Sequence, residues 1–244
     1  MLRASAAAPL VVTLLWSTDV LAYRPFDSTD ADVAAYHEAE IELGPVGFLQ
    51  LNHEQFLVAP AVIANVGIAS GWELVLEGRN RIKLGPSSSE ARAQISDAAF
   101  SAKGVLRPGV LQDDTGPSIA TEIGALFPAT GDDSGLGASA ALIISERAAI
   151  GTAHLNGGLL FTRSHEAGAF GGLILEGPIS WPVRPVAEAL VEHEFAHETL
   201  YSGLIGAIWP ARDHLALDAA YRLGVDEGVD FFEVRAGLTW SFEL

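Results

Sequence analysis

The chain has 244 residues and no cysteine. It carries a formal net charge of −17 at pH 7, yet its mean hydropathy is positive, at +0.28. The acidic balance argues against nucleic-acid binding, because phosphates select basic surfaces, and the lack of cysteine excludes a disulfide framework. A chain that is both acidic and apolar must place its charges and its apolar groups on different faces.

The first 22 residues have the pattern of a secretory signal peptide. Arg3 supplies the positive start, residues 6–16 are mostly apolar, and Val20 and Ala22 stand at −3 and −1 of a cleavage site. The alternative, an N-terminal membrane anchor, is disfavoured because the apolar run is too short to cross a bilayer. We therefore expect a mature domain of residues 23–244.

The mature chain alternates between polar and apolar residues with a period of two. The alternation runs through residues 38–43, 72–84, 152–162, 214–223 and 231–244. The last segment is the most regular, with apolar residues at every even position from Phe232 to Leu244. A period of two predicts strands with one charged face and one apolar face.

Turn signals rich in Gly, Pro, Asp and Ser separate these segments, which indicates about twelve strands of roughly ten residues each. Trp72, Trp181, Trp209 and Trp240 fall near strand ends, where aromatic girdles lie. The pattern predicts an all-β fold, an antiparallel up-and-down transmembrane β-barrel with both ends in the periplasm. The alternative is a secreted β-sandwich, but lipid explains so many apolar faces more simply than one shared core.

The stretch VEHEFAHETL, residues 191–200, contains the H-E-x-x-H pattern of zinc proteases. In a helix, His193 and His197 would lie one turn apart and could share a metal. In a strand they would lie about 13 Å apart, with Glu194 on the opposite face. Because the segment also alternates, we interpret it as a strand that leads into a hairpin, and we expect no metal, no cofactor and no catalytic residues. A barrel hydrolase would need a Ser and a His placed together, and no nucleophile motif is present.

With the strands laid out, the chain resembles the "MetA-pathway of phenol degradation" family of bacterial outer-membrane proteins. The resemblance is carried by ELGPVGFLQ (42–50), FLVAPAVIANVGIASGWELVLEGR (56–79), GPSIATEIGALFP (116–128), GLGASAALIIS (135–145), AHLNGG (153–158), SGLIGAIW (202–209) and VRAGLTWSF (234–242). It implies an exported β-barrel that transports small molecules. The end of the chain also resembles the signal read by the barrel assembly machinery, with Arg235, Gly237, Trp240 and Phe242 as its elements, although the final residue is Leu244 rather than an aromatic.

These observations favour a narrow outer-membrane channel for small molecules. Its expected partners are outer-membrane lipids and lipopolysaccharide, the assembly machinery and a small-molecule substrate, with no nucleic acid. Acidic excess in the lumen would favour cations. The alternative is a structural or surface-interaction barrel with no transport, whose lumenal charges pair and close it. The candidate lumen-lining residues are Glu73, Glu77, Arg79, Arg81, Lys83, His154, Asn156, Asp218, Arg222, Glu233 and Arg235.

Overall fold

The computed structural model describes residues 24–85, 93–130, 135–195 and 199–244. The predicted signal segment, residues 1–22, and His197 lie outside the described residues. Within the described residues there are twelve strands and no helix. The strands are β1 (Glu38–Leu51), β2 (Glu54–Ala69), β3 (Trp72–Leu84), β4 (Ala93–Arg107), β5 (Ser118–Leu126), β6 (Gly137–Ala148), β7 (Gly151–Phe161), β8 (Ala167–Glu176), β9 (Arg184–Glu194), β10 (Thr199–Arg212), β11 (Leu215–Asp226) and β12 (Val229–Glu243).

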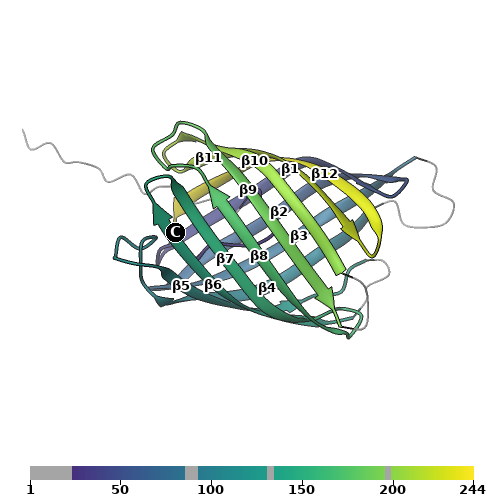
Figure 1. Ribbon diagram of the computed structural model, residues 1–244, viewed down its shortest axis with the longest axis horizontal. Coiled ribbons are helices and arrows are strands. Elements are labelled where there is room, and N and C mark those ends of the chain that lie inside the picture. The colour runs from purple at the N-terminus through teal and green to yellow at the C-terminus, as the bar shows by residue number, and fades with distance from the viewer. Residues whose placement is uncertain (1–23, 86–92, 131–134, 196–198) are drawn as a thin grey trace, which may run out of the picture.

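The strands form one closed antiparallel barrel in which each strand pairs with its neighbours in sequence (Figure 1). The barrel closes between β1 and β12, where Glu38 lies opposite Glu243 and Leu51 lies opposite Phe231. We call the end at which β1 begins and β12 ends the terminal rim, and the opposite end the distal rim. The predicted fold class is confirmed.

The ladders of the described strands contain six register shifts, of which one each in the β1–β12, β2–β3 and β3–β4 ladders bears on the lumen. The β1–β12 register shifts between Leu43 and Val46, and the β2–β3 register shifts between Val58 and Ala61. In β4 the irregularity includes Asp97, whose φ of 54° lies in the left-handed region. Proline lacks the amide hydrogen that a ladder needs, so Pro45 and Pro60 account for the first two interruptions. A bulge re-aims a side chain, and at Asp97 it directs the carboxylate towards two arginines of β3.

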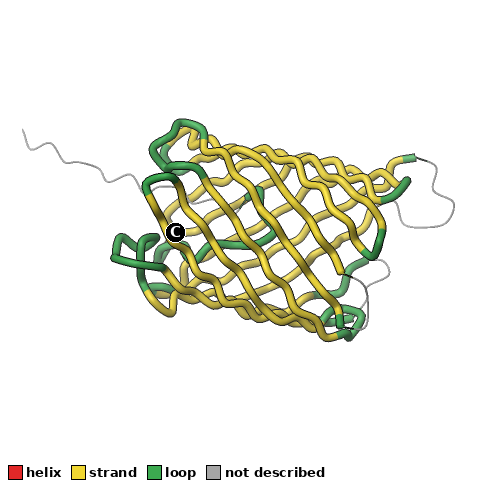
Figure 2. Tube along the Cα trace, viewed as in Figure 1, coloured by secondary structure: helices red, strands yellow, loops and turns green. Residues whose placement is uncertain are grey.

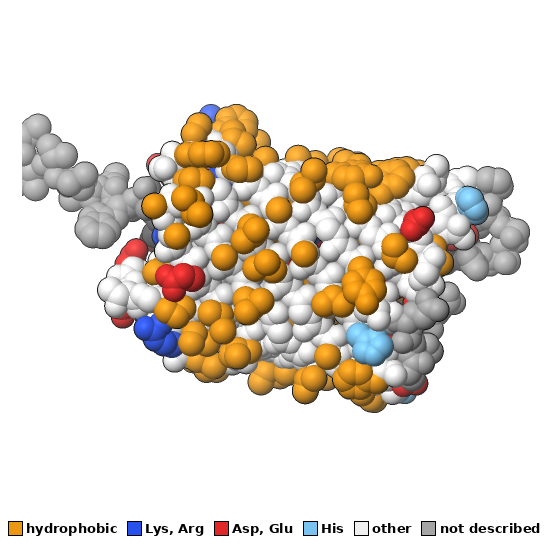
Figure 3. Space-filling model, in the orientation of Figure 1, with side chains coloured by type: hydrophobic (Ala, Val, Ile, Leu, Met, Phe, Trp, Pro, Cys, Tyr) orange, Lys and Arg blue, Asp and Glu red, His pale blue; other side chains and the backbone are white. Residues whose placement is uncertain are grey.

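On the face of the barrel seen in Figure 3, apolar side chains are spread over the middle and the few charged side chains lie near the rims. Ile123, Leu159 and Ile205 are each more than 60% exposed, although they lie within strands. Trp72, Trp181, Trp209 and Trp240 are 44 to 54% exposed, and the register places them near the terminal rim. The outside therefore has an apolar band with aromatic residues along one border.

The segment with the zinc-protease pattern is a strand up to Glu194. His193 pairs with Thr199 across the β9–β10 hairpin, and its Nδ1 lies 3.0 Å from the Thr199 hydroxyl. The helical reading of this stretch is wrong because the backbone is extended up to Glu194. None of the described residues belongs to a helix long and apolar enough to cross a membrane.

Candidate functional site: the lumen and its N-terminal belt

Residues 24–37 precede the first strand and run inside the barrel. We call this segment the belt. It carries no regular secondary structure and is drawn as a loop within the ring of strands in Figure 2. Its sequence, RPFDSTDADVAAYH, combines proline with Asp, Ser and Thr, which favour turns over strands. The belt contacts β11 and β12 through Arg24, β9 through Asp27 and β3 through Ala34, so it follows the inner wall around much of the barrel.

Two wall side chains hold the middle of the belt by its main chain. The Glu188 carboxylate accepts hydrogen bonds from the amides of Asp27 and Ser28, at 2.9 and 2.7 Å. Asn156 binds both sides of Thr29: its Oδ1 accepts from the Thr29 amide at 3.3 Å and its Nδ2 donates to the Thr29 carbonyl at 2.8 Å. Both wall residues are at least 95% buried, so these bonds satisfy groups that would be costly to leave unpaired.

A chain of hydrogen bonds positions Ser145, the next wall residue that binds the belt. The Ala31 amide donates to Ser145 Oγ at 2.9 Å, Ser145 Oγ lies 2.8 Å from His154 Nδ1, and His154 Nε2 lies 3.0 Å from Glu176 Oε1. Arg184 Nη1 lies 3.4 Å from the other Glu176 oxygen. The donors are all satisfied if His154 carries its proton on Nε2, because Ser145 then donates to Nδ1. The structure thus places a Ser, a His and a carboxylate together, which sequence spacing did not reveal.

The belt carboxylate of Asp27 is paired with two arginines of the wall. Its Oδ1 lies 2.8 Å from Arg235 Nη2 and its Oδ2 lies 2.7 Å from Arg222 Nε. Burial opposes ionisation of Asp27, but Arg235, Arg222 and Arg79 outweigh it and lower the pKa of this carboxyl to about 2. Arg235 Nη1 also donates to the Pro25 carbonyl at 2.8 Å.

A second group of polar side chains contacts the belt residues that follow, Thr29 to Asp32. Lys103 Nζ contacts Thr29 Oγ1 at 3.1 Å and Asp30 Oδ1 at 3.3 Å, and it is 3.8 Å from Glu73. Burial and the adjacent Asp30 carboxylate raise the pKa of Asp32 to about 7, even though Gln112 donates to it at 2.9 Å. Asp32 therefore changes its charge near neutral pH while it is seated.

Two apolar side chains of the belt fill hollows in the wall. Phe26 packs against a buried cluster that includes Val186, Leu204 and Ile208 from β9 and β10. Ala31 is fully buried with Ala120 and Ile143. Burial of an aromatic side chain contributes about 1.5–3 kcal/mol, so Phe26 adds apolar stabilisation to the polar contacts of the belt.

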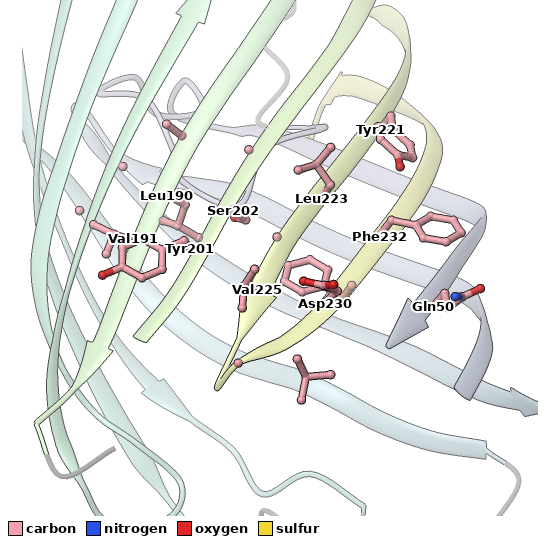
Figure 4. Close-up of a pocket in the computed structure, with 18 of the residues that line it drawn as sticks. Gln50, Leu190, Val191, Tyr201, Ser202, Tyr221, Leu223, Val225, Asp230 and Phe232 are labelled. Atoms are coloured by element: carbon pink, nitrogen blue, oxygen red, sulfur yellow. The ribbon is translucent and has the colours of Figure 1, made fainter. Parts of the chain in front are cut away.

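A cavity of about 1190 Å³ lies between the belt and the distal rim. Its lining includes Asn156 and Gly172, which adjoin the belt, and residues of the β1–β2 and β11–β12 turns. Leu190, Ser202 and Asp230 border it from neighbouring strands (Figure 4). A smaller cavity of about 60 Å³ lies beside Arg24, Phe26 and Arg79. The two cavities thus differ widely in volume, and the larger one lies towards the distal rim.

The candidate residues from the sequence fall into three groups. Glu73, Asn156, Asp218, Arg222 and Arg235 contact the belt directly, and His154 does so through Ser145. Arg79 and Arg81 pair with Asp97, and Arg79 also lies 3.4 Å from Glu233. Lys83 lies 2.5 Å from Glu54 at the distal rim, away from the belt, and Glu77 borders the smaller cavity.

The proposed elements of the assembly signal lie on β12. Trp240 and Phe242 stand two residues apart, with their rings 5.3 Å apart. A Cβ at Gly237 would lie 2.3 Å from Arg24 Nε, so a larger residue there would displace the Arg24 side chain from Asp218. Arg235 faces the belt, so it has a lumenal role besides any role in assembly.

Several residues that hold the belt, four on strands of the wall and Gln112 in the β4–β5 loop, were not candidates from the sequence. They are Glu42, Lys103, Gln112, Ser145 and Glu188. Lys103 had a local signal, since it is a single cation in the otherwise small and apolar stretch AAFSAKGV. Glu42 and Glu188 lie in alternating segments, which mark them as polar-face residues, but nothing local identifies their partner because that segment is distant in sequence.

Solved structures of outer-membrane barrels share this fold. The COG4313 outer membrane channel from Pseudomonas putida F1 superposes with a TM-score of 0.58 at 9% identity, covering 89% of this chain and 100% of that one. The KdgM porin gives a TM-score of 0.54 at 11% identity, covering 84% and 99%. The same porin in complex with disordered oligogalacturonate gives 0.52 at 12% identity. No protein-family model and no curated protein sequence matches the chain.

Proposed function

We propose that this protein is an outer-membrane channel for small molecules, and that its belt limits passage through the lumen. The observation that carries the proposal is the belt itself, a segment seated by hydrogen bonds across the interior of the barrel. The outer face supports a membrane location, because an apolar band bordered by aromatic residues matches the lipid-facing surface of such barrels. The shared fold with channels and porins supports the same class.

The lumenal charges favour a narrow, selective path over a wide pore. Arg79, Arg235 and Asp27 lie in a network of ion pairs with Glu233 and Asp97. A barrel of this strand number has little interior left once side chains fill it, and the belt reduces it further. The chain retains a net charge of −17, so we propose that the open lumen prefers cations.

Conductance in planar bilayers tests the proposal. We expect small or rare currents from the native protein and larger currents from Asp27→Ala, because this change removes both ion pairs of the belt with Arg222 and Arg235. Glu54→Ala is a matched control, since its ion pair with Lys83 lies at the distal rim. Silent membranes with both variants, despite folded protein, would favour the alternative of a structural barrel with no transport.

The proposed membrane location has consequences for signal-peptide cleavage and for binding partners. We propose cleavage after Ala22, so that the mature chain begins at Tyr23 with the terminal rim in the periplasm. Partners would be outer-membrane lipids and lipopolysaccharide, with the assembly machinery reading β12. N-terminal sequencing of protein extracted from outer membranes tests the cleavage site, and an intact segment of residues 1–22 would contradict it.

The resemblance to the MetA-pathway family suggests small aromatic compounds as solutes, and we propose that the chain is a member. Liposome swelling with a panel of small aromatics, sugars and amino acids would rank these solutes directly. Swelling that is fastest with aromatics would support membership, and equal rates for all solutes of one size would contradict an aromatic preference.

A further inference from the structure

We propose that the inner wall is a binding track for an extended peptide, and that the belt is its resident ligand. The proposal deepens the channel function, since it names the class of molecule that the lumen recognises. It rests on which belt atoms the wall contacts. Most of these contacts are to main-chain amide and carbonyl groups, which every peptide has.

Side chains of the wall bind amide and carbonyl groups of the belt along most of its length. Acceptors meet amides and donors meet carbonyls, and one amide side chain does both. Four amide contacts are those of Glu42 with Arg24, Glu188 with Asp27 and Ser28, and Glu73 with Ala34. One carbonyl contact is that of Arg235 with Pro25. Both main-chain groups are bound at Thr29, by Asn156, and at Ala31, where Ser145 binds the amide and Gln112 the carbonyl.

The wall groups that make these contacts are deeply buried and fixed in place. Glu73 and Ser145 are fully buried, and Asn156 and Glu188 are 3% and 5% exposed. Ser145 is held by His154, which is held in turn by Glu176. The belt itself covers these groups in the seated state, but the hydrogen bonds among wall residues, such as that between Ser145 and His154, do not involve the belt and lower the ordering cost of binding. The wall therefore resembles a preorganised site for main-chain atoms.

Side chains of the belt add sequence preference to this main-chain recognition, and those of Phe26 and Asp27 make the largest contribution. Phe26 enters the apolar hollow of β9, β10 and β11, and Asp27 pairs with Arg222 and Arg235. Ser28 lies directly against Gly172, so this position of the track accepts only a small side chain. The ligand class is an unfolded peptide of about the length of the belt, with an apolar residue followed by an acidic one.

A competition experiment on the full chain tests the track. The double variant Phe26→Ala with Asp27→Ala weakens the belt and leaves every wall residue native. Gly67→Ala releases the belt by a second route, since a Cβ there would lie 1.9 Å from the Ala35 carbonyl oxygen. The probe is a fluorescein-labelled peptide with the sequence of residues 24–35, RPFDSTDADVAA, and binding is measured by anisotropy in detergent.

We expect the weakened chains to bind the probe at least about tenfold more tightly than the native chain, because the tethered belt competes at high effective concentration. A peptide N-methylated at the positions of Asp27, Ser28 and Ala31 should lose about tenfold or more in affinity, since it cannot donate to Glu188 and Ser145. A peptide with its sequence shuffled after the Phe–Asp pair should lose less affinity than the methylated peptide, because the main-chain bonds remain while the side-chain contacts of Thr29, Asp30 and Asp32 are lost.

Equal binding of the methylated and parent peptides would overturn the proposal, and so would the absence of binding to chains whose belt is released. Release is checked separately by maleimide labelling of Ser28→Cys, which is specific because the chain has no cysteine. The anisotropy needs no current through the barrel. A protein that binds the probe but never conducts would therefore contradict the channel function and leave the track standing.

Discussion

Replacing Glu188 by glutamine should release the belt without disturbing the barrel. The Glu188 carboxylate accepts two belt amides, at 2.9 and 2.7 Å. A glutamine side chain would keep one acceptor oxygen, lose the negative charge and present an NH₂ group to the other amide. Hydrogen bonds to charged groups contribute about 1.5–3 kcal/mol each, so the exchange should cost the seated belt about 2–4 kcal/mol. That corresponds to an increase of about 30- to 1000-fold in the released population.

Maleimide labelling of Ser28→Cys measures that population. The Ser28 hydroxyl oxygen is buried without a hydrogen-bond partner, so a thiol should replace it at little cost. The labelling rate follows the fraction of time that residue 28 is outside its site, provided that opening and closing are fast. We expect the rate to rise by the factor calculated for Glu188→Gln.

Glu192→Gln is the matched control. Glu192 lies on the same strand and faces the same side as Glu188, four residues and about 13 Å nearer the distal rim. Its substitution should leave the labelling rate unchanged. The reasoning is refuted if both variants label equally fast, because the charge of the lumen in general, and not the two amide contacts, would then hold the belt.

Three further predictions concern the outer face, pH and catalysis. On the outer face of β10, Ile205→Arg should lower the unfolding free energy in lipid by about 2–4 kcal/mol. Tyr201→Arg lies nearer the distal rim and should lower it by only about 0–1 kcal/mol. Equal losses from the two variants would argue against a membrane-embedded band. The raised pKa of Asp32 means that the seated belt holds the Asp32 proton more tightly than the released belt does. The belt should therefore be seated less firmly as the pH rises from about 4 to about 7, and the labelling rate of Ser28→Cys should increase. Asp32→Asn should abolish this dependence of the labelling rate on pH. Finally, a fluorophosphonate probe should not label Ser145, because its hydroxyl is buried and engaged by the Ala31 amide; labelling that Ser145→Ala abolishes would identify a hydrolase.

The sequence predicted the barrel because its evidence is local and repeated. Each strand carries its own alternation, and residues 231–244 alone are enough to assign both faces of β12. The same period of two argued against a helix at His193 and Glu194, and the extended backbone of β9 agrees with it. A repeat of strands that each bear an apolar face has few folded solutions, and closure of the sheet in lipid is one.

The tertiary structure alone decided what fills the barrel. Residues 24–37 have no period, and their partners lie far along the chain: Thr29 is 127 residues from Asn156, Asp27 is 161 from Glu188, and Arg24 is 194 from Asp218. The pattern marked Asn156 and Asp218 as inward and polar, but it held no information about what they would meet. Glu188, in an alternating strand like many others, showed nothing to distinguish it from Glu192. Closing the barrel brings all of these side chains around one interior, and only there does an unpatterned polar segment find enough fixed donors and acceptors to replace water.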